Sequence, residues 1–376
     1  MTIRKPSLKD SERGRRGIEE RQFSITGPEQ KRPRDMGKAL KSRSFKLQLP
    51  KFLAREWQNQ SYKSIFGDCH VYLDIPGEVL HYHVVGDVLT CQSVDHLINN
   101  HEEADTNIVF HAKAIDNEKE GDIIVRASDT DVAIILLYHC NKFKSRLWMD
   151  VGTTSKNSRR YICITTISNV LGPQICAALP GFRAFTGSDY TSLFVRKGKV
   201  KPYHKMEKNE EAQKAFQCLA TEIGPSNDTE KTLQVFTAAI YGAKNANVTL
   251  NQHRYQVFEK GFGTSSTKNP FSKLRGINAS SIPPCEVELS THIKRAAFVS
   301  QMWVNADMAH IRQHPHVSNG WNLVEGHYTP VFHEGLQMPK TLVPQQNDLM
   351  NSYESDDEGL DVSSADESDY SENDVL

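Results

Sequence analysis

Hydrophobic and polar residues alternate along the segment from Cys69 to Cys91, which is the pattern of half-buried β-strands. Pro76 and Gly77 interrupt the alternation, and this residue pair favours a tight turn. The segment therefore predicts a β-hairpin.

The segment from His101 to about Gly224 changes repeatedly between helix-like and strand-like patterns. Its predicted elements are a helix at Glu103–Ala114, a strand at Asp122–Ala127, an apolar run at Val132–Tyr138, a strand at Tyr161–Thr166 and a helix at Thr166–Leu179. The run at Val132–Tyr138 is the longest apolar stretch of the chain and fits a buried strand. Such alternation predicts an α/β fold with a mostly parallel sheet flanked by helices.

The flanking segments have different patterns. Ser7–Arg21 predicts a basic helix, Phe45–Trp57 an amphipathic segment broken at Pro50, and Pro180-Gly181 a turn. Helices are expected at 228–262 and 292–312, with a loop at 263–290. The predicted domains are a basic arm and helix at 1–60, an α/β domain at 61–224, a mainly helical region at 225–345 and a disordered acidic tail at 346–376.

Composition narrows the class of protein. The chain has 376 residues, of which 38% are hydrophobic, so it can bury a sizeable core. No apolar run is long enough to span a bilayer, and the first residues do not resemble a secretory signal. Its seven cysteines are scattered and never spaced as CxxC, which argues against a disulfide framework or a zinc ribbon. We therefore expect an intracellular protein without a membrane partner, either nuclear or cytoplasmic, with the nucleus favoured.

The charge of the chain is strongly asymmetric. Residues 1–46 contain fourteen Lys and Arg residues against six acids, whereas residues 346–376 contain eleven acids and no basic residue. Basic arms are common where a protein binds phosphate, and they are equally common in plain solvated termini. Charge alone leaves both interpretations open.

Three acidic clusters lie within the α/β region: Glu102-Glu103-Ala104-Asp105, Ser128-Asp129-Thr130-Asp131 and Gly187-Ser188-Asp189-Tyr190. The second cluster directly follows a predicted strand, and ligands of open α/β sheets bind beyond the carboxyl ends of the strands. Hard divalent ions take oxygen ligands, and they can stabilise both the attacking and the leaving oxygen of a phosphodiester. Taken singly, such a cluster is more often a helix cap or a turn than a binding site, so the prediction rests on the joint order and context of the three clusters.

The motifs EEADT (102–106), ASDTDVAIILL (127–137) and FTGSDYTSLF (185–194) together resemble the flap-endonuclease/XPG, or PIN-like, superfamily. The residues within these motifs are most similar to those of uncharacterised, often transposon-associated animal proteins. The resemblance implies a PIN-like domain at 61–224 and one or two Mg²⁺ or Mn²⁺ ions. It also implies five catalytic, metal-binding carboxylates: Glu103, Asp105, Asp129, Asp131 and Asp189.

The resemblance extends to basic residues that would bind phosphate, namely Lys9, Arg16, Lys197 and Lys199. Lys9 and Arg16 are seven residues apart, so they share one face of the predicted helix. Two further carboxylates of the family would precede Met1, which leads us to expect a chain shortened at its N-terminus relative to the family. The absence of this upstream segment would also remove central strands of the sheet, unless the segment Val71–Val85 replaces those strands.

The predicted function is divalent-metal-dependent hydrolysis of DNA or RNA, with DNA favoured. The alternatives are a catalytically inactive PIN-like scaffold that binds nucleic acid or protein, and a non-functional transposon remnant. The histidine pairs His81/His83 and His314/His316 are interpreted as structural or surface residues because no cysteine or acid accompanies them at a fitting spacing. Trp303 and Trp321 are interpreted as core residues.

Overall fold

The computed structural model describes residues 23–335 except 155–156, 223, 246, 263–278 and 312–315, together with Leu8 and Ser11. Apart from Leu8 and Ser11, the predicted basic helix, including Lys9 and Arg16, lies outside the described residues, as do His314 and the acidic tail. Among the described residues, no helix has both the length and the apolar character needed to cross a bilayer.

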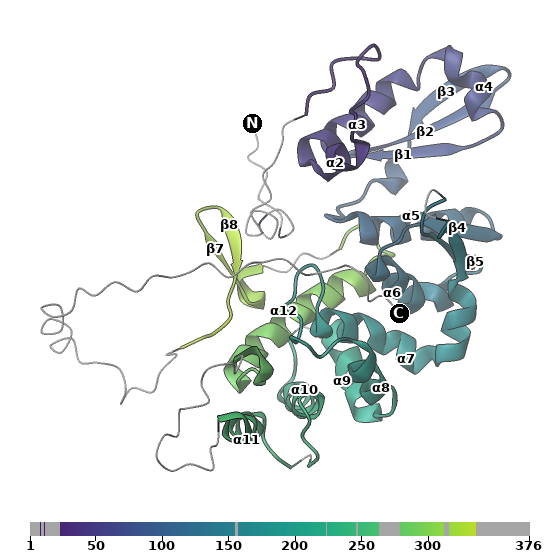
Figure 1. The fold of residues 1–376 in the computed structure, drawn as a ribbon. Helices are drawn as coiled ribbons and strands as arrows, with labels where there is room; N and C mark the ends of the chain where they lie inside the picture. The colour runs from purple at the N-terminus through teal and green to yellow at the C-terminus, as the bar shows by residue number, and fades with distance from the viewer. Residues whose placement is uncertain are drawn as a thin grey trace, which may run out of the picture.

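The first unit of the fold combines three helices with an antiparallel sheet (Figure 1). The helices are α2 (Met36–Lys41), α3 (Arg43–Glu56) and α4 (Lys63–Phe66). Helix α3 continues through Pro50, so the predicted break is wrong. Buried packing of Phe45 and Ala54 on either side of Pro50, and a hydrogen bond from the Tyr82 hydroxyl to the Ala54 carbonyl, hold the helix together across it.

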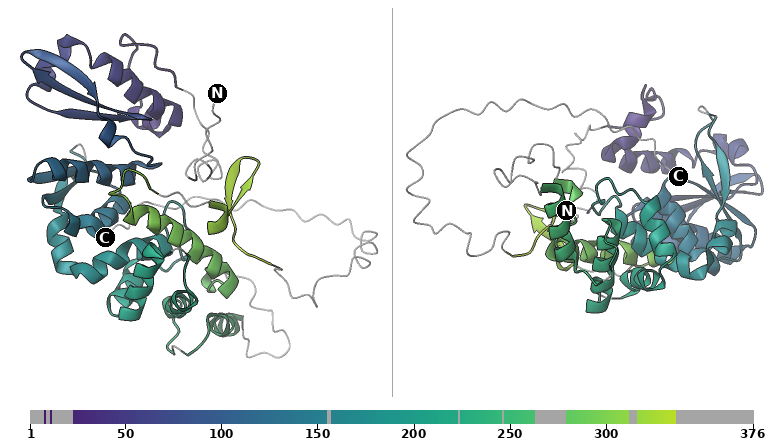
Figure 2. Two further views of the ribbon diagram at one scale, coloured as in Figure 1. Left: turned by 180° about the vertical axis from the view of Figure 1, so that it is seen from behind. Right: turned by 60° about the horizontal axis from the view of Figure 1, so that its bottom comes forward.

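The predicted hairpin is confirmed, with one strand more than expected. Strands β1 (Val71–Ile75), β2 (Glu78–Val85) and β3 (Val88–Ser93) form an antiparallel sheet in the order β1-β2-β3. Gly77 adopts a φ of 91° in the first turn, a conformation that favours glycine. This sheet does not hydrogen-bond to the strands of the α/β region and so does not replace central strands. Figure 2 shows the unit at one end of the molecule.

The α/β region consists of α5 (Ala104–Glu118), β4 (Asp122–Arg126), α6 (Thr130–His139), β5 (Arg146–Val151), β6 (Arg160–Cys163) and α7 (Ile164–Thr186). Strand β4 pairs with β5 in parallel and β5 with β6 in antiparallel fashion. The predicted mixture of helices and strands is therefore confirmed. The sheet, however, has three strands and a single parallel pair, and sequence analysis did not predict β5.

The apolar run Val132–Tyr138 was predicted to be a buried strand, and this prediction is wrong. The run forms most of helix α6. The side chain of Asp129 caps this helix by accepting a hydrogen bond from the Asp131 amide. Val132, Ile135 and Leu136 are all almost fully buried. A helix that is apolar around most of its circumference belongs in a protein interior, and its run of apolar residues resembles that of a buried strand.

Helix α7 is longer than predicted and continues through Pro180-Gly181, so the turn predicted there is wrong. It bends instead at Gly172, whose φ of 79° is non-helical, and Pro173 follows in the first turn after the bend. At Gly181 a Cβ atom would lie 2.2 Å from the Phe216 carbonyl oxygen. This glycine therefore allows a close approach of the neighbouring helix rather than a turn.

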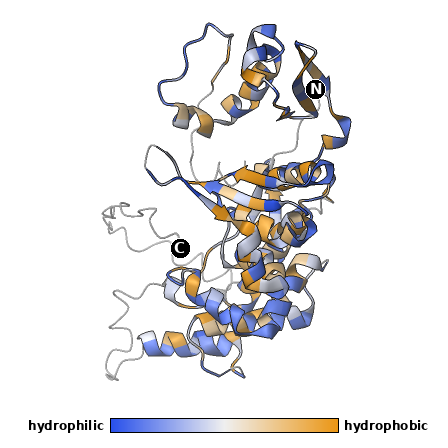
Figure 3. Ribbon diagram, turned by 90° about the vertical axis from the view of Figure 1, so that its right-hand side faces the viewer, coloured by the Kyte–Doolittle hydropathy of each residue, from blue (hydrophilic) through white to orange (hydrophobic). Residues whose placement is uncertain are grey.

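The described residues from 200 onward are mainly helical. Helices α8 (Val200–Glu207) and α9 (Glu210–Thr221) were not predicted, whereas α10 (Asn227–Ile240) and α11 (Leu250–Phe262) cover most of the helical segment expected at 228–262. Helix α12 (Glu286–Val304) begins within the loop expected at 263–290, and a hairpin of β7 (Trp321–Val324) and β8 (His327–Pro330) follows it. Helix α12 packs on α7, α9 and α6 and so joins the two regions (Figure 1). Trp303 and Trp321 are 1% and 0% exposed, which confirms both as core residues. Figure 3 shows hydrophobic residues gathered on the middle strands and helices, with more hydrophilic residues on the helices at the lower end.

Candidate functional site

Two of the predicted carboxylates meet where strand β4 passes into helix α6. Asp129 is exposed, and its Oδ1 accepts a hydrogen bond from the Asp131 backbone amide at 2.9 Å. Asp131 lies in the first turn of α6 and is 6% exposed. Burial raises the pKa of Asp131, and the negative charge of nearby Asp129 acts in the same direction. The parallel strand therefore ends in a small acidic group, as the sequence predicts.

Arg183 of helix α7 completes this group. Its Nε donates to Asp131 Oδ1 at 2.6 Å, and its second terminal nitrogen donates to the Thr130 hydroxyl at 2.8 Å. Burial raises the pKa of Asp131, and the arginine opposes that shift by favouring the ionised form. The carboxylate of Asp131 is therefore balanced by a fixed cation of the protein itself.

Lys199 connects this group to the turn that precedes the third acidic motif. Its Nζ donates to the Gly187 carbonyl oxygen at 2.8 Å, two residues before the exposed Asp189. Burial lowers the pKa of Lys199 to about 8, with nearby Arg183 lowering it further and Asp131 opposing. Gly187 has a φ of 118°, and a Cβ there would lie 2.9 Å from Leu193 Cα. The turn before Asp189 thus requires glycine.

Lys197 contacts a different part of the protein. Its Nζ is 4.1 Å from the centroid of the Tyr241 ring, a cation–π contact, and burial lowers the pKa of the amine. Of the four predicted phosphate-binding residues, Lys199 lies near the charges of Arg183 and Asp131, and Lys197 packs on Tyr241. Lys9 and Arg16 lie outside the described residues.

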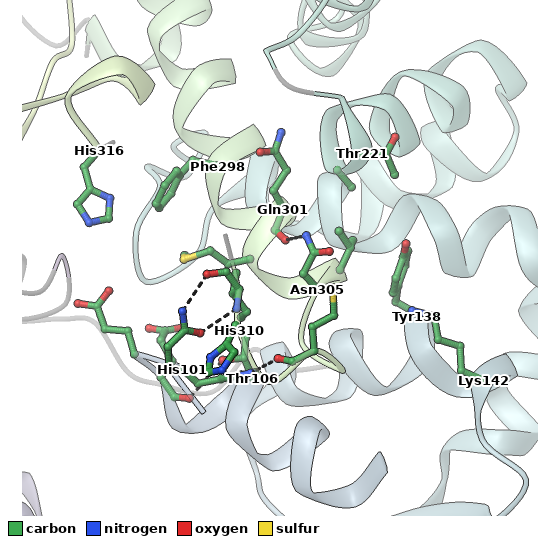
Figure 4. A pocket seen from close by; sticks show the side chains of 18 residues that line it. His101, Thr106, Tyr138, Lys142, Thr221, Phe298, Gln301, Asn305, His310 and His316 are labelled. Carbon is green, nitrogen blue, oxygen red and sulfur yellow. Dashed lines mark hydrogen bonds between the residues drawn. The ribbon is translucent and has the colours of Figure 1, made fainter. Parts of the chain in front are cut away.

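Glu103 and Asp105 belong to a second group at the start of α5. Glu103 is the buried N-cap residue of this helix, and Asp105 lies in its first turn. Glu102 and Glu103 line a cavity of about 470 Å³, whose other walls include Tyr138, Lys142 and the end of α12 (Figure 4). Histidines at three positions also line it: His101, His310 and His316. None of Asp129, Asp131 and Asp189 contributes to its lining.

The fit of this region to a metal ion can be judged from its donor atoms. Within the described chain, three potential ligand atoms lie within 4.8 Å of one another in two clusters, His70/His81/His83 and Cys285/Glu288/His333. No three of the five predicted carboxylates form such a cluster. Mg²⁺ commonly keeps several waters and takes one or two carboxylates, and the carboxylates of Asp129 and Asp189 are both exposed. They do not form an all-protein cage.

Sequence reasoning missed two residues of this region. Arg183 is the one charged side chain in the otherwise apolar stretch from Ile175 to Thr186, and a lone charge in such a stretch signals a buried partner. Asp150, at the end of the unpredicted strand β5, bonds to Arg126 and Arg159. These two arginines hold the pKa of Asp150 below its ordinary value, chiefly through hydrogen bonds from Arg159. Asp150 thus serves an ion-pair network.

No family model, curated protein or solved structure matches this chain. The resemblance to flap endonucleases therefore stays a prediction that rests on the three motifs.

Proposed function

We propose that this protein is a divalent-metal-dependent phosphodiesterase of the flap-endonuclease-like class that acts on a nucleic acid, with DNA as the favoured substrate. The observation that carries the proposal is the grouping of Asp129, Asp131, Arg183 and Lys199 where strand β4 ends. Carboxylates and fixed cations at one point suit the handling of a phosphodiester, because the former hold a metal ion and the latter neutralise phosphate charge.

Each residue of the group would have a distinct role. Asp129 and Asp189 would hold Mg²⁺ or Mn²⁺, and the bound ion would stabilise negative charge on the phosphate oxygens. Lys199, with a pKa of about 8, is mostly protonated at pH 7 and would offer a positive charge to the phosphate. Arg183 orients Asp131 and favours its ionised form, against the effect of burial. Glu103 and Asp105 lie in the separate group at the start of α5. The proposal therefore places a single metal ion at the end of strand β4.

Cleavage assays with a matched pair of variants test this proposal. Full-length protein should cut branched DNA in the presence of Mg²⁺ or Mn²⁺, and Asp129→Asn should lower the rate at least about 100-fold, the usual effect of losing a group that stabilises transition-state charge. Asp122→Asn is the control, because Asp122 is an exposed acid at the opposite end of the same strand. Cleavage that persists in Asp129→Asn, or that needs no added metal ion, would count against the proposal.

A second candidate is a scaffold that binds nucleic acid without cutting it. The ion pair between Arg183 and Asp131, 2.6 Å long, favours this alternative because it neutralises one predicted ligand without any metal. Fluorescence anisotropy with labelled DNA, in buffer containing a metal chelator, separates the two candidates. A scaffold should bind DNA without cutting it under any metal condition, and Lys199→Gln should weaken that binding while Lys205→Gln, an exposed lysine of α8, should not.

A further inference from the structure

Three histidines meet on one face of the β1–β3 sheet, far along the chain from the acidic motifs. His81 and His83 lie two residues apart on β2, so both side chains point to the same face. His70 immediately precedes β1, which runs antiparallel beside β2, and it comes to lie against both. The ring centroids of His70 are 5.0 Å from His81 and 5.3 Å from His83, and those of His81 and His83 are 4.4 Å apart.

The ring nitrogens of these residues approach the geometry of a metal site. The His70 Nδ1 atom lies 2.9 Å from His81 Nε2, and one nitrogen from each ring lies within 4.8 Å of the others. In a tetrahedral zinc site with bonds of 2.0–2.1 Å, two ligand nitrogens are separated by about 3.3 Å. Small rotations of the rings would therefore direct three lone pairs at one point.

Thr90 fixes which nitrogen of His83 can bind. The Thr90 hydroxyl donates its one hydrogen to the His83 carbonyl oxygen at 2.9 Å, and its oxygen also lies 3.2 Å from His83 Nδ1. Because the hydroxyl hydrogen is already used, the ring must donate from Nδ1, which leaves Nε2 with its lone pair. A hydrogen bond of this kind commonly orients the histidine ligands of metal ions.

Two further neighbours suit a bound cation. Tyr72 stacks on His81 with ring centroids 4.4 Å apart and an interplanar angle of 5°, which holds the plane of the imidazole. The carboxylate of Glu118, at the end of α5, is near enough to act on the charge of both His81 and Tyr72. The cluster thus combines three imidazoles with a nearby negative charge and a supporting aromatic ring.

We propose that His70, His81 and His83 form a binding site for a divalent transition-metal ion, with Zn²⁺ as the best fit. Imidazole nitrogens suit Zn²⁺, Cu²⁺ and Ni²⁺, whereas Mg²⁺ and Ca²⁺ take oxygen ligands. His70 is exposed, so a fourth position is open to water. This site is independent of the proposed nuclease centre. The other cluster, Cys285/Glu288/His333, is a weaker candidate because Cys285 and Glu288 already cap helix α12.

Zinc titration of the full-length protein tests the proposal. Metal-free protein should bind one Zn²⁺ in competition with a chromophoric chelator, and His70→Gln or His81→Gln should lower the affinity at least about 100-fold, since each removes one of three ligands. His96→Gln, an exposed histidine of the same unit, and Cys285→Ser should leave the affinity within about twofold, as expected for groups outside a site. Circular dichroism of the metal-free variants shows whether each remains folded.

Thr90→Val provides a test that does not remove a ligand. Valine keeps the branched shape that suits a strand, so the metal-free fold should be retained while zinc affinity falls by roughly tenfold or more, the usual effect of losing a supporting hydrogen bond. Substitution with Co²⁺ distinguishes the two clusters, because a cysteine ligand adds thiolate-to-cobalt absorption in the near ultraviolet. Unchanged zinc affinity in both His70→Gln and His81→Gln, or loss of binding in Cys285→Ser together with that absorption, would overturn the proposal.

Discussion

The ion pair between Asp131 and Arg183 connects residues that are 52 positions apart, and it is formed largely out of contact with water. Removing one partner of such a pair leaves the other charge buried and unbalanced, which destabilises a protein more than removing both. The same pair decides how much negative charge the end of strand β4 offers to a cation. It therefore affects both stability and the proposed chemistry.

Arg183→Gln should lower the free energy of unfolding by about 2–3 kcal/mol, below the range for fully buried pairs because the arginine is partly exposed. The double variant Asp131→Asn/Arg183→Gln should recover most of that loss, since no charge is left buried. Urea denaturation at pH 7.5 measures both, with Arg196→Gln, an exposed arginine, as the control. Additive losses in the double variant would show that the two side chains do not depend on each other.

At the scale of elements, two prolines lie inside helices in different ways. Pro50 stands in the middle of α3, where it removes one backbone hydrogen bond and crowds the preceding turn. Pro173 follows the bend at Gly172 and occupies the first turn of a new helical stretch, where an amide hydrogen has no helical partner in any case.

Pro50→Ala should therefore raise the free energy of unfolding, by roughly 1–3 kcal/mol, as the missing hydrogen bond forms and the crowding is relieved. Pro173→Ala should have no effect or destabilise by up to about 1 kcal/mol, because it only adds freedom to the unfolded chain. Thermal unfolding followed by circular dichroism compares the two. A loss of stability in Pro50→Ala would mean that α3 depends on its proline.

Elements with a clear local pattern were predicted well from the sequence. The β1–β2 hairpin, α5 and β4 follow from period and turn residues, and α10, α11 and most of α12 lie in the segments expected to be helical. The pattern failed for α6, because a helix that is apolar on most sides has no period to detect. It failed at Pro180-Gly181 because only the neighbouring helix α9 explains why this glycine lies within a helix.

At the scale of the whole molecule, two buried histidines join helix α12 to the α/β region. His292 Nε2 donates to the Phe185 carbonyl at 2.7 Å, and His139 Nε2 donates to the Trp303 carbonyl at 3.0 Å. Burial lowers the pKa of each histidine from 6.5 to about 4. For His139, the Asp307 carboxylate 3.6 Å away opposes this shift without cancelling it.

These pKa values make the stability of the protein depend on pH. Both histidines take up protons in the unfolded chain below about pH 6.5 but remain neutral in the folded protein until about pH 4, so stability present at pH 7.5 is lost as the pH falls through this window. The full loss is roughly 3 kcal/mol for each histidine. Urea denaturation at pH 7.5 and 4.5 should show a smaller loss for His292→Gln than for the unmodified protein. His204→Gln, an exposed control, should show the full loss.

The sequence by itself determined the local elements with a clear period and the position of Asp129 and Asp131 directly after a strand. It also carries the three motifs on which the proposed function depends. The tertiary structure alone decided that Arg183 and Lys199 join Asp131, that Glu103 lines another cavity, and that His70 meets His81 and His83. The physical reason is that period and turn chemistry act within a few residues, whereas these contacts depend on how whole helices and strands pack together.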